Sequence, residues 1–375
     1  MKRNVLITGG AGFIGSNLAL NLLNKGYNVR ILDNLSEQIH GQNSLPPKRL
    51  EGTTDFVIGD VRNRGDWEKA LDNQHIVVHL AAETGTGQSM YEIQKYVDVN
   101  INGTAIFLNY LVNNRHSVEK VVVASSRAIY GEGKYFCSAH GDVYPGERSE
   151  SDLKKGDYEP KCPVCNKGIS IKPTDENSKI HPSSVYGITK QNQEQMVLNV
   201  CRSIGVPAVA LRYQNVYGPG QSLKNPYTGI LSIFSTQIRN GNNINIFEDG
   251  RESRDFVFID DVVRATVLGL EREEVNYQSL NVGSGVQTSV LEVATILNQQ
   301  YEKNVELIIS GNFRLGDIRH NFADLTKIKN LIGFTPAYDF NKGATLFAQW
   351  VKEQKVEQDK FSKSIKEMEA KGLFK

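Results

Sequence analysis

A tyrosine and a lysine four residues apart, Tyr186 and Lys190, could do acid/base chemistry together. They fall in a segment of helical character, 185–203, and side chains at positions i and i+4 project from the same face of a helix. Free tyrosine has a pKa near ~10, so a phenol acts as a base near neutral pH only beside positive charge. The pair therefore predicts a proton-transfer site. A tyrosine and a lysine that merely share a helix surface are the alternative.

A glycine-rich turn, Thr8-Gly-Gly-Ala-Gly-Phe-Ile-Gly15, stands near the start of the chain. It lies between a predicted strand at 4–8 and a predicted helix at 13–25, and a second predicted strand at 28–33 ends in Asp33. In this context glycines let the backbone approach a pyrophosphate, and the helix N-terminus offers it unpaired N–H groups. Asp33 would bond the adenine ribose hydroxyls and repel a 2′-phosphate, so we predict tightly bound NAD. A purely structural glycine turn is the alternative.

The ends of the next strands extend this predicted cofactor site. Asp60 follows a predicted strand at 55–58 and could meet the adenine, although a surface cap explains it equally well. His79 ends a buried strand, where a histidine is more often a satisfied core residue than a catalyst. The predicted NAD-binding residues are Gly9, Gly12, Phe13, Ile14, Gly15, Asp33, Asn34, Asp60, Val61, Leu80, Ala81, Ala82, Asn100, Tyr186 and Lys190.

Strands alternate with helices as far as residue 217, which predicts an α/β fold: a Rossmann-type doubly wound parallel sheet with a smaller C-terminal substrate lobe. Further strands are predicted at 75–80, 118–124 and 206–212, and further helices at 66–71 and 91–114. We expect an NAD-binding domain of residues 1–215 and 255–272 and a substrate lobe of 216–254 and 273–350. Residues 351–375 are highly charged, and we expect a solvated helical tail without a catalytic role.

Three of the four cysteines belong to a stretch, 134–172, that separates Tyr130-Gly131 from the helix of the tyrosine and lysine. Cys137-x-x-His140 and Cys162-x-x-Cys165 supply four ligands in two knuckle-like pairs, which predicts a closed structural zinc site. A Cys162–Cys165 redox pair and free thiols are the alternatives. Cys201 is expected in the core.

The overall composition limits which binding partners and which cellular compartment we expect for this protein. The formal net charge of +1 gives no broad basic field for nucleic acid and no polybasic membrane anchor. No apolar run approaches the roughly 20 residues of a membrane helix, and glycines interrupt the apolar N-terminal stretch, so it does not read as a signal peptide. Four cysteines do not form a secreted disulfide framework. We expect a cytoplasmic protein.

The combined motifs resemble the extended short-chain dehydrogenase/reductase family over nearly all of residues 1–340. They are Thr8-Gly-x-x-Gly-x-x-Gly15, Asp60-Val61, His79-Leu-Ala-Ala82, Ser125-Ser126-x-x-x-Tyr130-Gly131, Tyr186-x-x-x-Lys190 and Leu211-Arg-Tyr-x-Asn215. The resemblance implies three catalytic residues: Tyr186 exchanges a proton with a sugar hydroxyl, Lys190 holds the nicotinamide ribose, and Ser126 bonds the reacting oxygen. It also implies a homodimer joined through helices near 91–114 and 185–203.

Nucleotide-sugar enzymes look like the most similar members. In relatives, arginines at the positions of Arg254 and Arg314 hold the substrate diphosphate with an asparagine like Asn215, and Arg127 is a further candidate for substrate binding. Related dehydratases carry Asp-Glu where this chain has Arg127 and Ala128, which argues against dehydration and favours C4 epimerisation through a 4-keto sugar.

The 134–172 insertion resembles that of dTDP-L-rhamnose 4-epimerases, which implies conversion of dTDP-L-rhamnose to dTDP-6-deoxy-L-talose. Two alternatives stay open. One is an epimerase or decarboxylase of another nucleotide sugar. The other is a non-catalytic NAD-binding scaffold protein.

Overall fold

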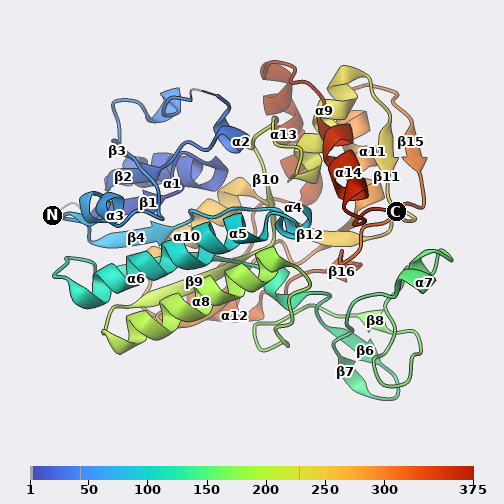
Figure 1. Cartoon of the computed structure of the whole chain (residues 1–375), viewed down its shortest axis with the longest axis horizontal. Helices are drawn as coiled ribbons and strands as arrows, with labels where there is room; N and C mark the ends of the chain where they lie inside the picture. Colours follow the sequence, from blue (N-terminus) through green and yellow to red (C-terminus); the bar gives the residue numbers. More distant parts are fainter. Residues whose placement is uncertain (1–2, 43, 228) are drawn as a thin grey trace.

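A seven-stranded parallel sheet runs through the computed structural model, which describes residues 3–42, 44–227 and 229–375 (Figure 1). The strand order is β13-β9-β5-β4-β1-β2-β3. The strands are β1 (Asn4–Thr8), β2 (Asn28–Asp33), β3 (Asp55–Ile58), β4 (Ile76–His79), β5 (Lys120–Ser126), β9 (Ala208–Tyr213) and β13 (Gln278–Val282). The first three have the predicted bounds, and the next three differ by one or two residues at their ends. The α/β doubly wound fold is confirmed.

Helices cover both faces of the sheet because side chains alternate along its strands. In β1, Val5 and Ile7 pack in one core with α1 (Phe13–Asn24) and α10 (Ile259–Glu271), whereas Leu6 belongs to the core on the other face. That second core is formed with α3 (Arg64–Leu71), α6 (Gly103–Asn113) and α8 (Val185–Ser203). Strands buried on both faces place their carboxyl ends in a fixed row, where ligands bind in such folds.

The predicted helix at 91–114 is interrupted by a wider turn. It consists of α5 (Ile93–Tyr96), a π-helical segment (Val97–Asn102) and α6. Single π turns inside helices occur frequently at functional sites. Here the π turn carries Asn100, which is completely buried.

A second lobe follows the sheet and lies at the upper right of Figure 1. It contains β10 (Asn215–Tyr217), β11 (Ile244–Ile246), β12 (Ser253–Phe258), β14 (Gln287–Ser289), β15 (Leu307–Ile309) and β16 (His320–Asn321), with helices α9 (Ile230–Asn240), α11 (Val290–Gln300) and α13 (Phe340–Glu353). One part of the predicted lobe belongs elsewhere: Gln278–Val282 pair with β9 as the edge strand of the main sheet. We missed this strand because Gln278-Ser-Leu-Asn-Val282 has only two apolar residues, which is too weak a local pattern to predict a strand.

The C-terminal tail is not the solvated helix that we expected. In α14 (Phe361–Ala370), Phe361, Ser364 and Met368 are buried, and the final residues pair with residues 313–315 through backbone hydrogen bonds such as Phe313 N to Lys375 O (2.8 Å). Apolar positions at i and i+7 are hidden among charges in the sequence, which is why composition alone misled the prediction.

The insertion forms a small unit of its own, seen at the lower right of Figure 1, with β6 (Tyr135–Cys137), β7 (Gly141–Val143), α7 (Glu150–Leu153) and β8 (Ser170–Ile171). Short elements elsewhere are α2 (Glu37–His40), α4 (Thr86–Ser89), α12 (Thr326–Ile332) and 3₁₀ turns at Lys48–Leu50 and Arg127–Tyr130. Among the helices described, none has the length and apolarity required to cross a membrane.

Candidate functional site

One cavity of about 560 Å³ lies between the carboxyl ends of the strands and the second lobe. It brings together all three predicted catalytic residues and all four predicted substrate-binding residues. These are Ser126, Tyr186 and Lys190, and Arg127, Asn215, Arg254 and Arg314. The predicted NAD-binding residues line it too, except Asp60 and Asn100.

The glycine turn occupies one end of the cavity. Gly9 has a φ of +68°, and a Cβ there would lie 2.9 Å from the Ala81 backbone. A Cβ on Gly15 would collide with Gly9 O, so the helix can approach the turn only with glycine at this position. Helix α1 begins after Gly12 without a side-chain cap, which leaves its first amides available to an anion. These features fit a dinucleotide pyrophosphate.

Asp33 closes the same end of the cavity at the end of β2. Its carboxylate accepts hydrogen bonds from Ala11 N and Leu35 N, both at 2.9 Å, and His40 Nε2 lies 3.7 Å away. Asp60 lies just outside the cavity lining. Hydrogen bonds from the Arg62 side chain lower the pKa of Asp60 to about 2, and Asp60 in turn accepts from Asn34 Nδ2 at 3.0 Å.

Two further polar residues lie behind the cavity wall. Asn100 accepts from Glu83 N at 2.7 Å and donates to Glu83 O and to Thr189 Oγ1, so it positions the loop after β4 from behind. His79 bonds Thr8 Oγ1 (2.7 Å) and Thr104 Oγ1 (3.0 Å), and burial lowers its pKa to about 3. It is the neutral core histidine that we expected.

The three predicted catalytic residues stand at the middle of the cavity. Ser126 ends β5, and Tyr186 lies in the first turn of α8, where Ser184 caps the helix by accepting from Gly187 N at 3.1 Å. Desolvation raises the pKa of Tyr186, while a hydrogen bond with Ser126 and the charge of Arg127 act to lower it. The local geometry thus gives the phenol two groups that favour its ionised form.

Lys190 lies one turn further along α8 and is almost fully buried. Its Nζ donates to Gln193 Oε1 at 2.8 Å, and burial lowers its pKa to about 7. Among the described residues Lys190 has no carboxylate partner, so a ligand whose hydroxyl oxygens accept hydrogen bonds from Nζ would stabilise its charged form.

Arginines gather at the other end of the cavity. Arg127 Nε donates to Asn215 Oδ1 at 2.9 Å, and Arg254 donates to Asp317 Oδ1 (3.0 Å) and Ile318 O (2.7 Å). The Arg314 guanidinium lies 4.9 Å from the centre of the Phe247 ring. Guanidinium groups held in this way suit a diphosphate, whose oxygens accept paired hydrogen bonds.

The sequence prediction did not include Asp317, which stands three residues after the predicted Arg314. Desolvation acts to raise the pKa of Asp317, but the charges of Arg254, Arg314, Arg148 and Arg127 outweigh it and keep the pKa below its ordinary value. One carboxylate thus holds together several arginines that would otherwise repel one another.

Other residues of the cavity were not among the predicted site residues. Gln214 and Glu252 are buried and line the cavity, and neither Gln214 amide atom nor Glu252 Oε2 has a hydrogen-bond partner among the described residues. Burial raises the pKa of Glu252 to about 7. The tail contributes Phe361, Ser364 and Met368 to the lining. Single polar or apolar residues without a motif cannot be assigned to a site before the chain is folded.

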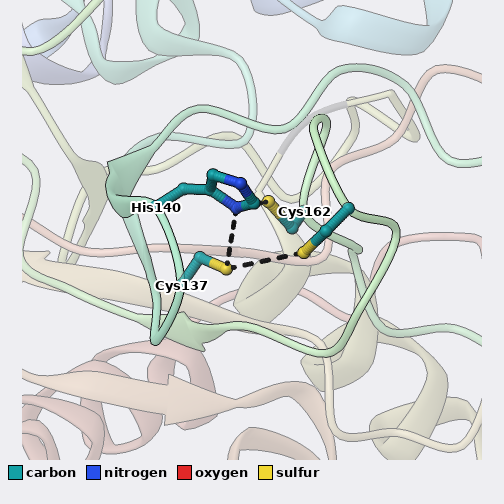
Figure 2. A group of neighbouring side chains, drawn as sticks. Cys137, His140 and Cys162 are labelled. Carbon is teal, nitrogen blue, oxygen red and sulfur yellow. Dashed lines mark hydrogen bonds between the residues drawn. The ribbon is translucent and has the colours of Figure 1, made fainter.

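The predicted metal ligands lie together outside this cavity, and Cys137, His140 and Cys162 point toward one another (Figure 2). The four potential ligand atoms of Cys137, His140, Cys162 and Cys165 lie within 4.8 Å of one another. Cys201 is buried in the core, as expected. The backbone amide of Ala139 and the His140 side chain lower the pKa of Cys137 to about 6, which favours a thiolate.

Comparison with known proteins agrees with this geometry. The model of the NAD dependent epimerase/dehydratase family matches residues 5–283. This chain belongs to that family. It is 37% identical over 355 residues to dTDP-L-rhamnose 4-epimerase of Burkholderia thailandensis, an alignment that covers 94% of this chain and 96% of the relative.

Two solved structures of nucleotide-sugar epimerases share the fold. UDP-glucose 4-epimerase of Thermotoga maritima, in a crystal structure with UDP-glucose, has a TM-score of 0.75 at 28% identity, covering 93% of this chain and 99% of that one. UDP-glucuronic acid 4-epimerase of Bacillus cereus, with UDP-glucuronic acid and NAD, has a TM-score of 0.75 at 26% identity and the same coverage. Membership of the epimerase/dehydratase family confirms the predictions of an NAD-dependent enzyme and of an isomerase.

Proposed function

We propose that this enzyme is an NAD-dependent nucleotide-sugar 4-epimerase that converts dTDP-L-rhamnose to dTDP-6-deoxy-L-talose. The observation that carries the chemistry is one cavity in which Ser126, Tyr186 and Lys190 lie between a dinucleotide-type glycine turn and a group of arginines. Support for the substrate comes from the relative of 37% identity, whose alignment spans nearly both chains. The resemblance of the insertion supports the same substrate.

In the proposed reaction Tyr186, Ser126 and Lys190 each have a separate role. Tyr186 takes the proton of the C4 hydroxyl, and its hydrogen bond with Ser126 and the charge of Arg127 favour the phenolate that this step needs. Ser126 bonds the reacting oxygen, and Lys190 orients the ribose next to it. After the 4-keto sugar has turned over, Tyr186 returns the proton to the oxygen on C4.

The cofactor fits the other end of the cavity. Gly9, Gly12 and Gly15 leave room for a pyrophosphate, and Asp33 ends β2 where an adenine ribose would lie. When bound here, NAD would supply hydride chemistry: it would accept a hydride from C4 as the 4-keto sugar forms and give the same hydride back to the opposite face of C4, so the reaction has no net redox change. Tight retention of NAD is part of this proposal, since no external reductant is then required.

A uronic acid nucleotide is the second candidate substrate. Arg127 lies near Tyr186 and could pair with a C6 carboxylate, and the Bacillus cereus structural relative is named for a uronic acid substrate. Against this candidate, Arg127 already donates to Asn215. An epimerase or a decarboxylase of such a sugar would both use this contact.

Proton NMR of dTDP-L-rhamnose, incubated with the purified enzyme and no added cofactor, tests the proposal. We expect new H4 couplings of a talo-configured product, which would support epimerisation with retained NAD. Parallel incubation with UDP-glucuronic acid tests the second candidate, where a C4 epimer indicates an epimerase and release of CO₂ a decarboxylase. No change with dTDP-L-rhamnose, while NAD is bound, would rule out this substrate.

A homodimer, a structural zinc ion and a cytoplasmic location complete the proposal. Ile93, Val97, Val112 and Ile188 are exposed on the adjoining helices α5, π turn, α6 and α8, an apolar surface that suits a second copy. Light scattering should give the mass of a dimer for the wild type and of a monomer for Ile188→Glu. A dimeric Ile188→Glu variant would argue against this interface.

A further inference from the structure

The Cys/His cluster has the dimensions of a zinc tetrahedron. With Zn–S near 2.3 Å and Zn–N near 2.0–2.1 Å, tetrahedral angles require about 3.8 Å between two sulfurs and about 3.5–3.6 Å between sulfur and nitrogen. Cys137 Sγ lies 3.8 Å from Cys165 Sγ, and His140 Nδ1 lies 3.5 Å from both Cys137 Sγ and Cys162 Sγ. A disulfide would need about 2.0 Å between the sulfurs.

The insertion has too small a core to hold its shape alone. Its buried apolar cluster consists of Tyr135, Cys137, Val143 and Cys162, so half of that core is made of potential metal ligands. Its sheet has three strands of two or three residues. Units of this size usually depend on a metal or on disulfides for stability.

The loop between two of the ligands reaches the arginine end of the cavity. Residues 141–161 lie between His140 and Cys162 and carry Arg148 and Glu159. Arg148, with a side chain only 4% exposed, donates to Asp317 O at 3.0 Å and to both oxygens of Glu248. Metal binding would close this loop at both ends.

A second set of contacts reaches the same segment. Glu159 accepts from Arg319 Nε at 2.9 Å and lies 3.2 Å from His320 Nε2. Glu132, which accepts from Tyr135 OH in the core of the insertion, also accepts from Arg319 N at 2.8 Å. Residues 317–319 in turn supply the acceptors that hold Arg254.

We propose that a zinc ion bound by Cys137, His140, Cys162 and Cys165 closes the insertion and so fixes residues 317–320, which position Arg254 for the substrate diphosphate. The metal takes no part in the chemical step. Among the described residues no contact joins the insertion to the glycine turn. Zinc binding should therefore leave NAD binding unchanged. The link to substrate affinity rests on the nucleotide-sugar substrate proposed above, whereas the metal and its effect on residues 317–320 do not depend on that substrate.

Metal content tests the first half of this proposal. We expect one zinc per chain by mass spectrometry in the reduced wild-type enzyme and in Cys201→Ala, and loss of zinc in Cys165→Ala. Cys201→Ala is the matched control because that cysteine is buried in the main core instead. A wild-type enzyme that binds no Zn²⁺ on titration would overturn the site. If Cys165→Ala does not fold, zinc is withdrawn from the wild type by a chelator and its release followed by absorbance.

Hydrogen exchange tests the coupling without reference to the substrate. On zinc loss, amides of residues 317–320 should exchange at least tenfold faster while those of residues 9–15 stay unchanged, and equal protection of both segments would refute the coupling. Arg148→Met should keep its zinc and show the same faster exchange at 317–320.

Affinity for dTDP, measured by calorimetry, tests the consequence for binding. It should fall about tenfold both without zinc and in Arg148→Met, while the NAD content per chain is kept. Unchanged dTDP affinity in the zinc-free enzyme would overturn the link to the substrate. If the wild type binds dTDP but does not convert dTDP-L-rhamnose, the substrate assignment fails and the zinc proposal stands.

Discussion

The two ends of the cavity are held in place by different interactions. At the glycine end, the backbone itself fixes the shape of the site: Gly9 adopts a positive φ, Gly15 lets α1 approach, and two backbone amides donate to Asp33. At the arginine end, Arg254 is held by acceptors on residues 317–319, which are held in turn by an insertion more than 150 residues earlier. The first end depends on local chain geometry and the second on long-range ion pairs.

This difference predicts that the two ends can be damaged separately. A steric change at the glycine turn should affect NAD and leave the arginines in place. A change in the ion-pair network should affect the nucleotide sugar and leave NAD bound. Changes at the proposed catalytic residues in the middle of the cavity should leave both NAD binding and nucleotide-sugar binding intact.

The largest effect is expected from Tyr186→Phe. Removing the phenolic oxygen removes the proposed proton acceptor, so turnover should fall by roughly 10³-fold, with NAD content and dTDP affinity unchanged. Turnover measured by NMR, with Tyr110→Phe on α6 as the control, checks this. A biological activity that survived in Tyr186→Phe would favour the scaffold alternative.

A smaller effect is expected from Arg254→Met at the arginine end. Loss of one partner in a buried, hydrogen-bonded charge network costs about 2 kcal/mol or more, so KM should rise by roughly 30-fold. NAD per chain should not change. Arg264→Met is the control, because Arg264 pairs with Asp261 away from the cavity. Loss of NAD in Arg254→Met would contradict the independence of the two ends.

Gly15→Ala should damage the opposite end. The new Cβ collides with Gly9 O, and overpacking of this kind costs about 1–3 kcal/mol. We expect lower Tm and loss of NAD during purification, whereas Gly146→Ala, in open space, should keep both properties of the wild type. Full NAD content in Gly15→Ala would show that the turn tolerates a side chain.

Deleting residues 361–375 should weaken only the substrate end. Phe361 and Phe374 pack on Phe247, whose ring in turn lies against Arg314. Each aromatic contact contributes about 0.5–1.5 kcal/mol, so KM should rise roughly two- to tenfold. Steady-state kinetics at equal NAD content measures this. An unchanged KM would mean that the tail lines the cavity but that its contacts with Phe247 do not affect substrate binding.

A shift along the pH axis is the subtlest expected effect. The Arg127 charge acts to lower the pKa of Tyr186, so Arg127→Met should raise that pKa and move the acid limb of kcat to higher pH. Arg127→Lys keeps the charge and should leave the limb where the wild type has it. If both variants have the same profile, charge at position 127 does not control Tyr186.

The sequence was sufficient for most of the sheet and for the glycine end. Strands such as β1 and β2 are predicted to the residue because their signals are local: an apolar run, a glycine turn and a terminal aspartate within 33 residues. Tyr186 and Lys190 could be paired for the same reason, since one helical turn separates them. The four residues of the Cys/His cluster were also recognisable as potential ligands, because each pair lies within four residues.

Only the tertiary structure brought Asp317 and Arg148 to the arginine end, placed Gln278–Val282 in the sheet, and turned the charged tail onto the cavity. These contacts join residues far apart in the chain, and none of them leaves a spacing pattern. An ion pair between distant residues depends on where the rest of the chain folds, whereas a glycine turn depends on its own neighbours. For this reason the sequence predicted the residues of the proposed site, including Arg254 and Arg314, but not the distant contacts that hold those arginines in place.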